Sequence, residues 1–172
     1  MVLYDFFYFP VYGMALGSQP VTSYNLGAGY PDRVFANIQL LLRTTLVWSL
    51  VVWVVMIFFT VPVVSLVLGN VPLTSYAIPL VRLSFIVFFV ATFQFVCQSS
   101  LQALNRPKST FLLGLSQTVL LLLPLVFWLP RLFPAYATES VFLACPIADV
   151  LVAFVTIIIL YRCIKQIKTI SI

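Results

Sequence analysis

Five polar side chains stand inside strongly apolar stretches of this sequence, where they could do chemistry. Gln94, Gln98 and Gln102 recur at every fourth position, so a helix would place all three on one face. Gln117 and Asp149 lie in two later apolar stretches. Polar groups at membrane depth are costly, and they usually pair with one another or face a water-filled cavity. These five side chains are therefore predicted either to line a cavity that handles amphipathic cations or to join helices by hydrogen bonds.

Asp149 is the sharpest of these candidates. It falls near the middle of the last apolar stretch, one turn after Pro146, whose missing N–H can leave a helix carbonyl free. An unpaired charge at that depth costs about 2.5–3.5 kcal/mol on insertion scales. Asp149 is therefore expected to be neutral, paired or cavity-facing. Two interpretations stay open: a proton- or cation-responsive group, or a buried ion pair between helices, with Arg43 or Arg82 as its partner.

The composition sets the class of protein. The chain of 172 residues is 63% hydrophobic and only 8% charged, with a mean hydropathy of +1.15. These values are far from those of soluble domains and predict an all-α, polytopic helical protein whose main partner is the lipid bilayer. The net charge of +5 comes from basic residues scattered at the ends of the apolar stretches, not from a basic–aromatic patch. No nucleic-acid partner is expected.

The sequence offers little for catalysis or for a resident metal. It has no histidine, which removes the commonest general base and the commonest metal ligand. Cys97, Cys145 and Cys163 are too few and too dispersed for a thiolate metal site or a disulfide framework. The four acidic residues lie far apart in the sequence, so no carboxylate pair is visible. We therefore expect no enzyme, no cofactor and no bound metal.

The elements that must position these groups are membrane spans. The apolar pattern predicts one membrane domain over 1–172, with a partial span at 1–26 and full spans at 38–61, 77–104, 110–129 and 139–162. Residues 63–76 are predicted to be a turn. Most lysines and arginines fall on one side of these spans, which predicts a cytoplasmic C-terminus. On that side stand Arg33, Arg106, Lys108, Arg162, Lys165 and Lys168.

A dense group of small and turn-forming residues occupies positions 13–33. Gly13 and Gly17 have the spacing that lets two helices approach closely in lipid. Pro20 is expected to bend or end its helix nearby. Gly27 and Gly29 suit a helix stop and a tight reversal, because glycine adopts left-handed conformations freely.

Three motifs together resemble a known family. The first comprises Gly17, Gln19, Pro20, Tyr24, Asn25, Gly27, Ala28 and Arg33. It resembles the signature that follows the second helix of each lobe in the multidrug and toxic compound extrusion (MATE) transporters, in the form seen in the second lobe of bacterial members. Residues 102–107 (QALNRP) are similar to the basic turn between the tenth and eleventh helices of that family. Residues 145–149 (CPIAD) are similar to a motif in its twelfth helix.

The resemblance implies a fold and a function. MATE transporters have twelve membrane helices in two similar lobes, and they export organic cations in exchange for sodium ions or protons. The chain would be part of such an antiporter in the bacterial cytoplasmic (inner) membrane. The match covers nearly the whole chain yet less than half of a transporter. A fragment that is inactive alone is therefore expected, with a missing N-terminal lobe or an upstream-encoded chain as its partner.

Other interpretations stay open. A flippase for lipid-linked saccharides shares the lobe architecture, although its cavity would need many basic groups and this chain has few. A non-transporting membrane scaffold, or the product of a decayed gene, would also fit the composition.

Overall fold

The computed structural model describes residues 2–69, 73–132 and 137–170, and every regular element in that part of the chain is helical. The predicted all-α fold is thereby confirmed. The helices are α1 (Val2–Gly27), α2 (Pro31–Phe58), α3 (Thr60–Leu68), α4 (Leu73–Ile86), α5 (Phe88–Ala103), α6 (Pro107–Leu115), the π-helix η1 (Ser116–Leu122), α7 (Leu123–Leu132) and α8 (Ala137–Ile170).

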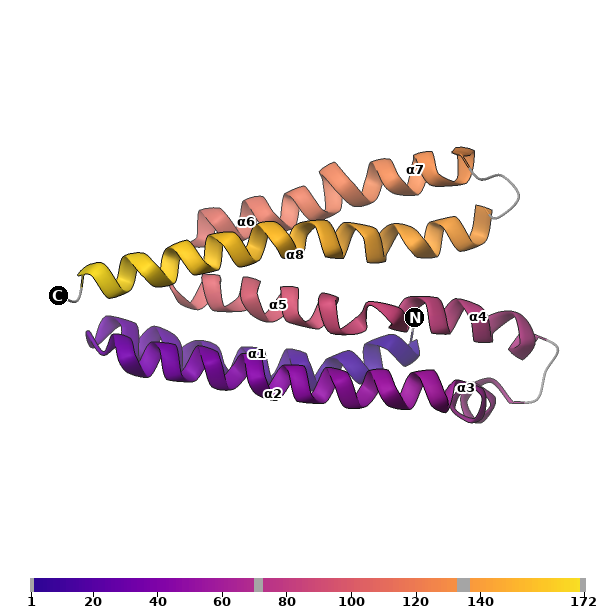
Figure 1. Cartoon of the computed structure of the whole chain (residues 1–172), viewed down its shortest axis with the longest axis horizontal. Coiled ribbons are helices and arrows are strands. Elements are labelled where there is room, and N and C mark those ends of the chain that lie inside the picture. Colours follow the sequence, from indigo (N-terminus) through magenta and orange to yellow (C-terminus); the bar gives the residue numbers. More distant parts are fainter. Residues whose placement is uncertain (1, 70–72, 133–136, 171–172) are drawn as a thin grey trace.

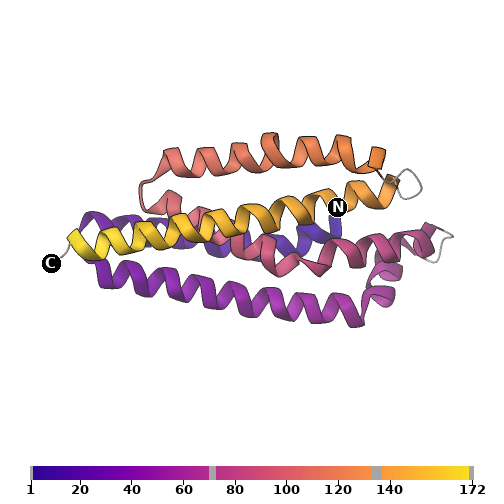
Figure 2. The ribbon, with the colours of Figure 1, turned by 45° about the horizontal axis from the view of Figure 1, so that its top comes forward.

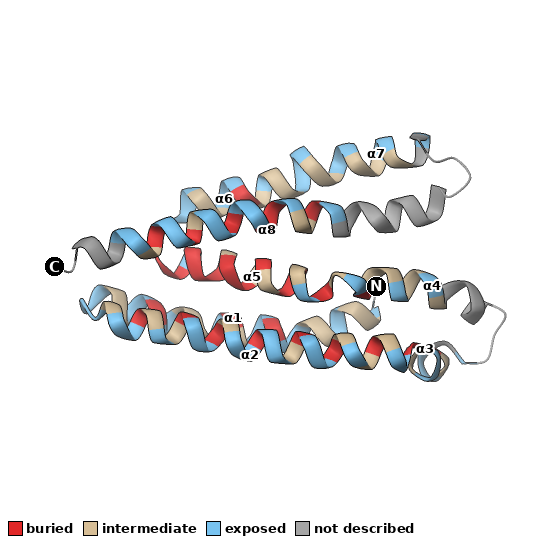
Figure 3. Ribbon diagram, in the orientation of Figure 1, coloured by how far each residue is buried: buried red, intermediate tan, exposed pale blue. Residues whose placement is uncertain are grey.

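Helix α5 lies at the centre of the bundle. It packs against α1 and α2 on one side and against α8 on the other, and α6, η1 and α7 form the outer layer on the α8 side of the bundle (Figures 1 and 2). Buried residues run along α5, whereas α6 and α7 carry mostly exposed and half-buried residues (Figure 3). Several buried positions of α5 are small, among them Ala91, Ser99, Ser100 and Ala103. Small side chains let neighbouring helices approach closely, which suits a central helix in lipid.

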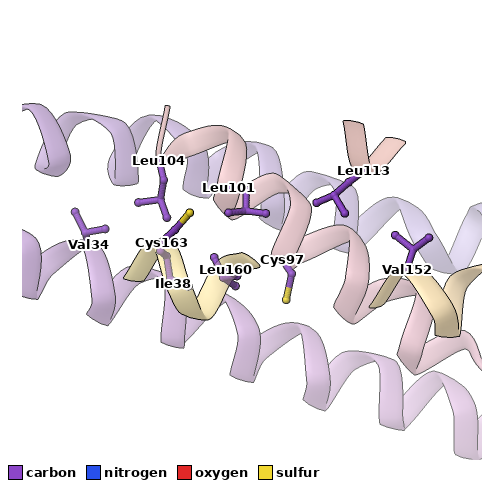
Figure 4. Packing of buried hydrophobic residues seen from close by; sticks show 9 residues of the cluster. All are labelled: Val34, Ile38, Cys97, Leu101, Leu104, Leu113, Val152, Leu160 and Cys163. Carbon is purple, nitrogen blue, oxygen red and sulfur yellow. The ribbon is translucent and has the colours of Figure 1, made fainter. Parts of the chain in front are cut away.

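The largest cluster of buried side chains joins four helices around one end of α5 (Figure 4). Leu101 of α5 is fully buried in it, and α8 contributes Val152 and Leu160 from the other side. The remaining members are Val34, Ile38, Cys97, Leu104, Leu113 and Cys163. This packing holds α2, α5, α6 and α8 at defined distances, and it therefore sets which polar groups can meet between them.

Two helix reversals are built in the same way. Gly29 and Asn105 each take a left-handed conformation, with φ of 75° and 56°, just past the ends of α1 and α5. The following amide bonds a carbonyl five residues earlier, at 2.9 and 3.2 Å respectively, which is the Schellman arrangement. Pro31 and Pro107 then begin the next helices, where their missing N–H is not needed. The predicted turn around residues 102–107 is thus present, and Gly29, not Gly27, is the left-handed glycine.

Three helices in the described residues are long and apolar enough to cross a membrane. They span Pro31–Phe58, Pro107–Leu129 and Ile147–Gln166, and the bent pair Ile78–Ile86 and Phe88–Ala103 would make a fourth. Helix α1 is not among them. The chain is thus a multi-pass membrane protein.

One local prediction was wrong, and the structure adds detail to two others. Helix α1 was expected to bend or end near Pro20, and it does not end there but runs on to Gly27. Part of the predicted turn at 63–76 is helical, because α3 continues to Leu68. The span predicted at 77–104 consists of two helices, α4 and α5, which meet at Val87 at an angle of 44°.

Candidate functional site

A chain of hydrogen bonds crosses three helices in the middle of the bundle. Gln94 of α5 donates from Nε2 to Oε1 of Gln117, over 3.0 Å. Gln117 of η1 donates in turn from Nε2 to Oδ1 of Asp149 on α8, over 2.7 Å. Gln94 is 3% exposed, while Gln117 and Asp149 are half-buried. Three of the five predicted polar residues thus meet, and we refer to them as the Gln94–Gln117–Asp149 chain.

The π-helix η1 carries the middle member of this chain. Within the described residues η1 is the one π-helical stretch, and Gln117 is its second residue. At its end, the N–H of Leu123 bonds the carbonyl of Thr118, five residues earlier. Pro124 follows directly and has no N–H to continue the ladder. Single wide turns of this kind occur frequently at functional sites.

The other two glutamines of the predicted stripe bond elsewhere. Gln98 donates from Nε2 to the backbone carbonyl of Thr110 on α6, over 3.2 Å. Gln102 is exposed, and its Oε1 lies 3.5 Å from Nε2 of Gln19 on α1. The three glutamines of α5 therefore each engage a different element and do not surround a common space within this chain.

Asp149 has no arginine partner among the described residues. Arg82, one of the two expected partners, donates from Nε to Oγ1 of Thr60, over 3.3 Å, and ties α4 to α3. Arg43, the other, is exposed on α2. The ion pair predicted as one alternative is thus not formed in the described structure, and the carboxyl is held by the neutral amide of Gln117.

Aromatic residues of α1 pack on α5, the helix that carries Gln94. The Tyr8 ring meets Phe95 of α5 edge-on at 5.5 Å. Tyr12 stacks on the same Phe95 at 5.6 Å, and Tyr4 stacks on Tyr8 at 5.9 Å. Sequence analysis missed this row, although tyrosines at positions 4, 8 and 12 share the four-residue spacing of the glutamines.

A second polar network joins α1 to α2 and α5. Gln19 donates from Nε2 to Oγ of Ser99, over 2.9 Å. Asn37 of α2 donates from Nδ2 to the hydroxyls of Ser18 and Thr22, both at 2.8 Å. Of these residues, sequence analysis singled out Gln19 alone. Asn37 stands in the apolar stretch of α2 and carried no motif that would have marked it.

The remaining motif residues lie on the surface of the described chain. A methyl group at Gly13 or Gly17 would meet no atom within 4 Å, so these glycines make no close helix contact within this chain. Tyr24 is 75% exposed, and Asn25 donates from Nδ2 to the Val21 carbonyl of its own helix, over 2.8 Å.

The other turn and proline positions have structural surroundings where they are described. Pro20, Gly27 and Ala28 are exposed. The guanidinium carbon of Arg33 lies 4.9 Å from the centre of the Tyr30 ring, a cation–π contact at the reversal. Pro146 belongs to α8, but its side chain lies outside the described residues. In the described part of the chain, no group of three or more histidines, cysteines or acidic residues could hold a metal ion.

Comparison with known proteins gives the chain its relatives. The chain is similar to the solved structure of the MATE multidrug transporter DinF-BH in complex with a ligand, with a TM-score of 0.81 and 28% identity. That match covers 92% of this chain and 35% of DinF-BH. The fold is also similar to the inward-facing conformation of a multidrug resistance MATE family transporter of the MOP superfamily, with a TM-score of 0.84 and 14% identity. Here 98% of this chain and 39% of the transporter are covered.

The same comparisons fix the family and the extent of the likeness. The chain spans little more than a third of the length of either transporter. A search of curated protein sequences found no match. The MatE family model matches residues 1–128, well over half of the sequence. The chain therefore belongs to the MatE family.

Proposed function

We propose that this chain forms part of the second lobe of a multidrug antiporter that exports organic cations in exchange for sodium ions or protons. The observation that carries the proposal is the Asp149 carboxyl, held at membrane depth by the Gln117 amide and by no arginine among the described residues. A permanent ion pair would neutralise the carboxylate, whereas an amide leaves its charge available. Such a group can exchange a proton or a metal cation as its surroundings change.

The surroundings of Asp149 also suit an organic cation. The aromatic row of α1 packs on Phe95 of α5, the helix that carries Gln94, and aromatic faces attract cations by several tenths of a kcal/mol to about 2 kcal/mol. DinF-BH, the multidrug transporter that is similar to this chain, was solved with a ligand bound. If the coupling ion and the organic cation both bind at the Asp149 carboxyl, they compete for it, and the exchange of one for the other requires that competition.

Transport by this mechanism needs a second lobe. Repeat-built transporters carry substrate by rocking one repeat against the other around a shared site. The chain covers little more than a third of the related transporters, so we propose that a first lobe completes it.

A flux measurement tests the proposed function directly. A transporter whose second lobe is this chain, reconstituted in liposomes, is expected to move a fluorescent organic cation against its gradient when a sodium or proton gradient is imposed. The two gradients are applied separately, so the assay also identifies the coupling ion. Liposomes with neither gradient are the control. Dye movement that ignores both gradients would contradict antiport.

Orientation in the membrane gives a further prediction. We propose that the end carrying Arg33, Arg106 and Arg162 faces the cytoplasm of a bacterial inner membrane, because lysine and arginine are retained on that side. Cys97 and Cys163 are buried and would label poorly, so the native cysteines are first replaced by alanine.

Single exposed cysteines then show on which side of the membrane each position lies. In intact cells, an impermeant thiol reagent is expected to label Leu66→Cys, at the far end of α3, and not Gln166→Cys, near the C-terminus. After the cells are opened, both variants should label. Labelling of Gln166→Cys alone in intact cells would reverse the orientation.

A further inference from the structure

We propose that Gln117 is a positioning residue whose amide orientation transmits the charge state of Asp149 on α8 to Gln94 on α5. This inference deepens the proposed function, because it assigns a route by which an ion bound at Asp149 can influence the central helix. It assigns a role to the middle of the Gln94–Gln117–Asp149 chain, where the hydrogen bonds have a definite direction.

The observed direction suits an ionised Asp149. A carboxylate can only accept hydrogen bonds, so it draws the amino side of the Gln117 amide, here at 2.7 Å. The carbonyl side of the same amide then points to Gln94, which must donate, and its Nε2 does so at 3.0 Å. Since a glutamine amide has a donor side and an acceptor side, the charge at one end sets the orientation of both amides.

Neutralisation of Asp149 permits the opposite direction. When a proton binds, the carboxyl gains an O–H donor, which can bond the Gln117 carbonyl once that amide has turned. The amino side of Gln117 then faces Gln94, which turns to present its own carbonyl. Both hydrogen bonds are kept, but donor and acceptor are exchanged in each. The Gln94–Gln117–Asp149 chain therefore has two complete arrangements that differ in the charge of Asp149.

The local structure favours such a rearrangement. Among the charged and titratable groups described, Tyr8 of α1 interacts electrostatically with Asp149, and Arg82 of α4 is engaged with Thr60 instead. Gln117 is half-buried on the π-helix, where no residue is fully buried, and the turn exchanges an amide oxygen and nitrogen of nearly equal size, so it leaves the shape of either glutamine unchanged. Gln94, by contrast, is 3% exposed on the central helix, so a change in its hydrogen bonding acts on the core of the bundle.

A reversal of polarity by mutation tests this role in the full chain in lipid nanodiscs. Gln94→Glu introduces a side chain that, when ionised, can only accept, so it competes with Asp149 for the amino side of Gln117. We expect the unfolding temperature to fall by about 5 °C. Adding Asp149→Asn supplies an amide that can donate to the Gln117 carbonyl. The double variant is expected to return to within about 2 °C of the parent.

A matched pair of variants, Gln98→Glu with and without Asp149→Asn, shows whether the rescue depends on the Gln94–Gln117–Asp149 chain. Gln98→Glu changes a neighbouring glutamine of α5 that bonds the Thr110 carbonyl instead, so adding Asp149→Asn should bring no recovery there. If Gln94→Glu yields no folded protein, recovery of folded protein in the double variant is the same rescue. The proposal is overturned if Gln94→Glu is not rescued by Asp149→Asn, or if Gln98→Glu is rescued equally.

Transport separates this role from simple packing. In the reconstituted transporter, Gln117→Leu is expected to lower ion-driven turnover about tenfold, while the half-saturating dye concentration changes by less than about twofold. The positioning role is overturned if Gln117→Leu changes the half-saturating dye concentration as many-fold as the turnover, or if it changes neither. Rescue in nanodiscs without any ion-driven flux by the parent transporter would refute the proposed function and leave the hydrogen-bond polarity established.

Discussion

Replacement of Asp149 by asparagine is expected to reduce ion-coupled drug export about tenfold or more in a transporter that contains this chain. Asparagine has nearly the same shape, and its carbonyl oxygen can still accept the hydrogen bond that Gln117 donates over 2.7 Å. It carries no charge and binds no proton, however, so exchange at this position is lost. The unfolding temperature should change little, and dye efflux driven by an ion gradient is the measurement.

Asp32→Asn is the matched control for that variant. Asp32 is exposed in the first turn of α2, at the reversal and away from the hydrogen-bond chain, so its replacement should leave export near the parent level. If Asp149→Asn lowers the unfolding temperature, and export falls only because less folded protein is present, Asp149 has a structural role only. Unchanged export and unchanged stability would remove Asp149 from both roles.

Residues 1–172 expressed alone are expected to give no drug efflux. Alternating access needs two lobes that move against each other around a shared site, and this chain covers 35% of DinF-BH. The exposed face of α1 with Gly13 and Gly17 and the exposed surface of α6 and α7 have no partner within the described part of the chain. A drug-hypersensitive strain that expresses the chain should therefore retain dye as the empty strain does.

The outcome of this expression experiment is read against two controls. A complete MATE transporter in the same strain confirms that the assay detects efflux, and membrane fractionation confirms that the chain is present. Robust efflux by the chain without a partner would overturn the need for a first lobe. It would point instead to a small transporter assembled from several copies of this chain.

Composition and local motifs were enough to identify the class and the family of this protein. A chain with 63% hydrophobic residues is far more apolar than soluble domains, which indicates a lipid environment, and helices satisfy their own backbone there. The turn at Asn105 and Pro107 was also predictable, because a left-handed residue followed by proline acts within a few residues of chain. These features depend on near neighbours in the sequence, and so the sequence contains them.

The break between α4 and α5 was decided by tertiary structure. No proline or glycine stands near Val87 to mark it, and the sequence alone predicted a continuous span. Trp53 of α2 donates from its indole nitrogen to the backbone carbonyl of Ile86, over 3.2 Å, at the residue before the break. The partner lies 33 residues away in the sequence, so no local pattern could reveal it.

The candidate site shows the same division. The spacing of Gln94, Gln98 and Gln102 placed them on one helix face, but helical periodicity does not say which helix a face meets. Gln94 and Gln117 are 23 residues apart, and Gln117 and Asp149 are 32 apart. Their pairing depends on how α5, η1 and α8 pack and on the wide turn that carries Gln117. The sequence alone determined which polar groups enter the membrane, whereas the packing of the helices decided which of them meet.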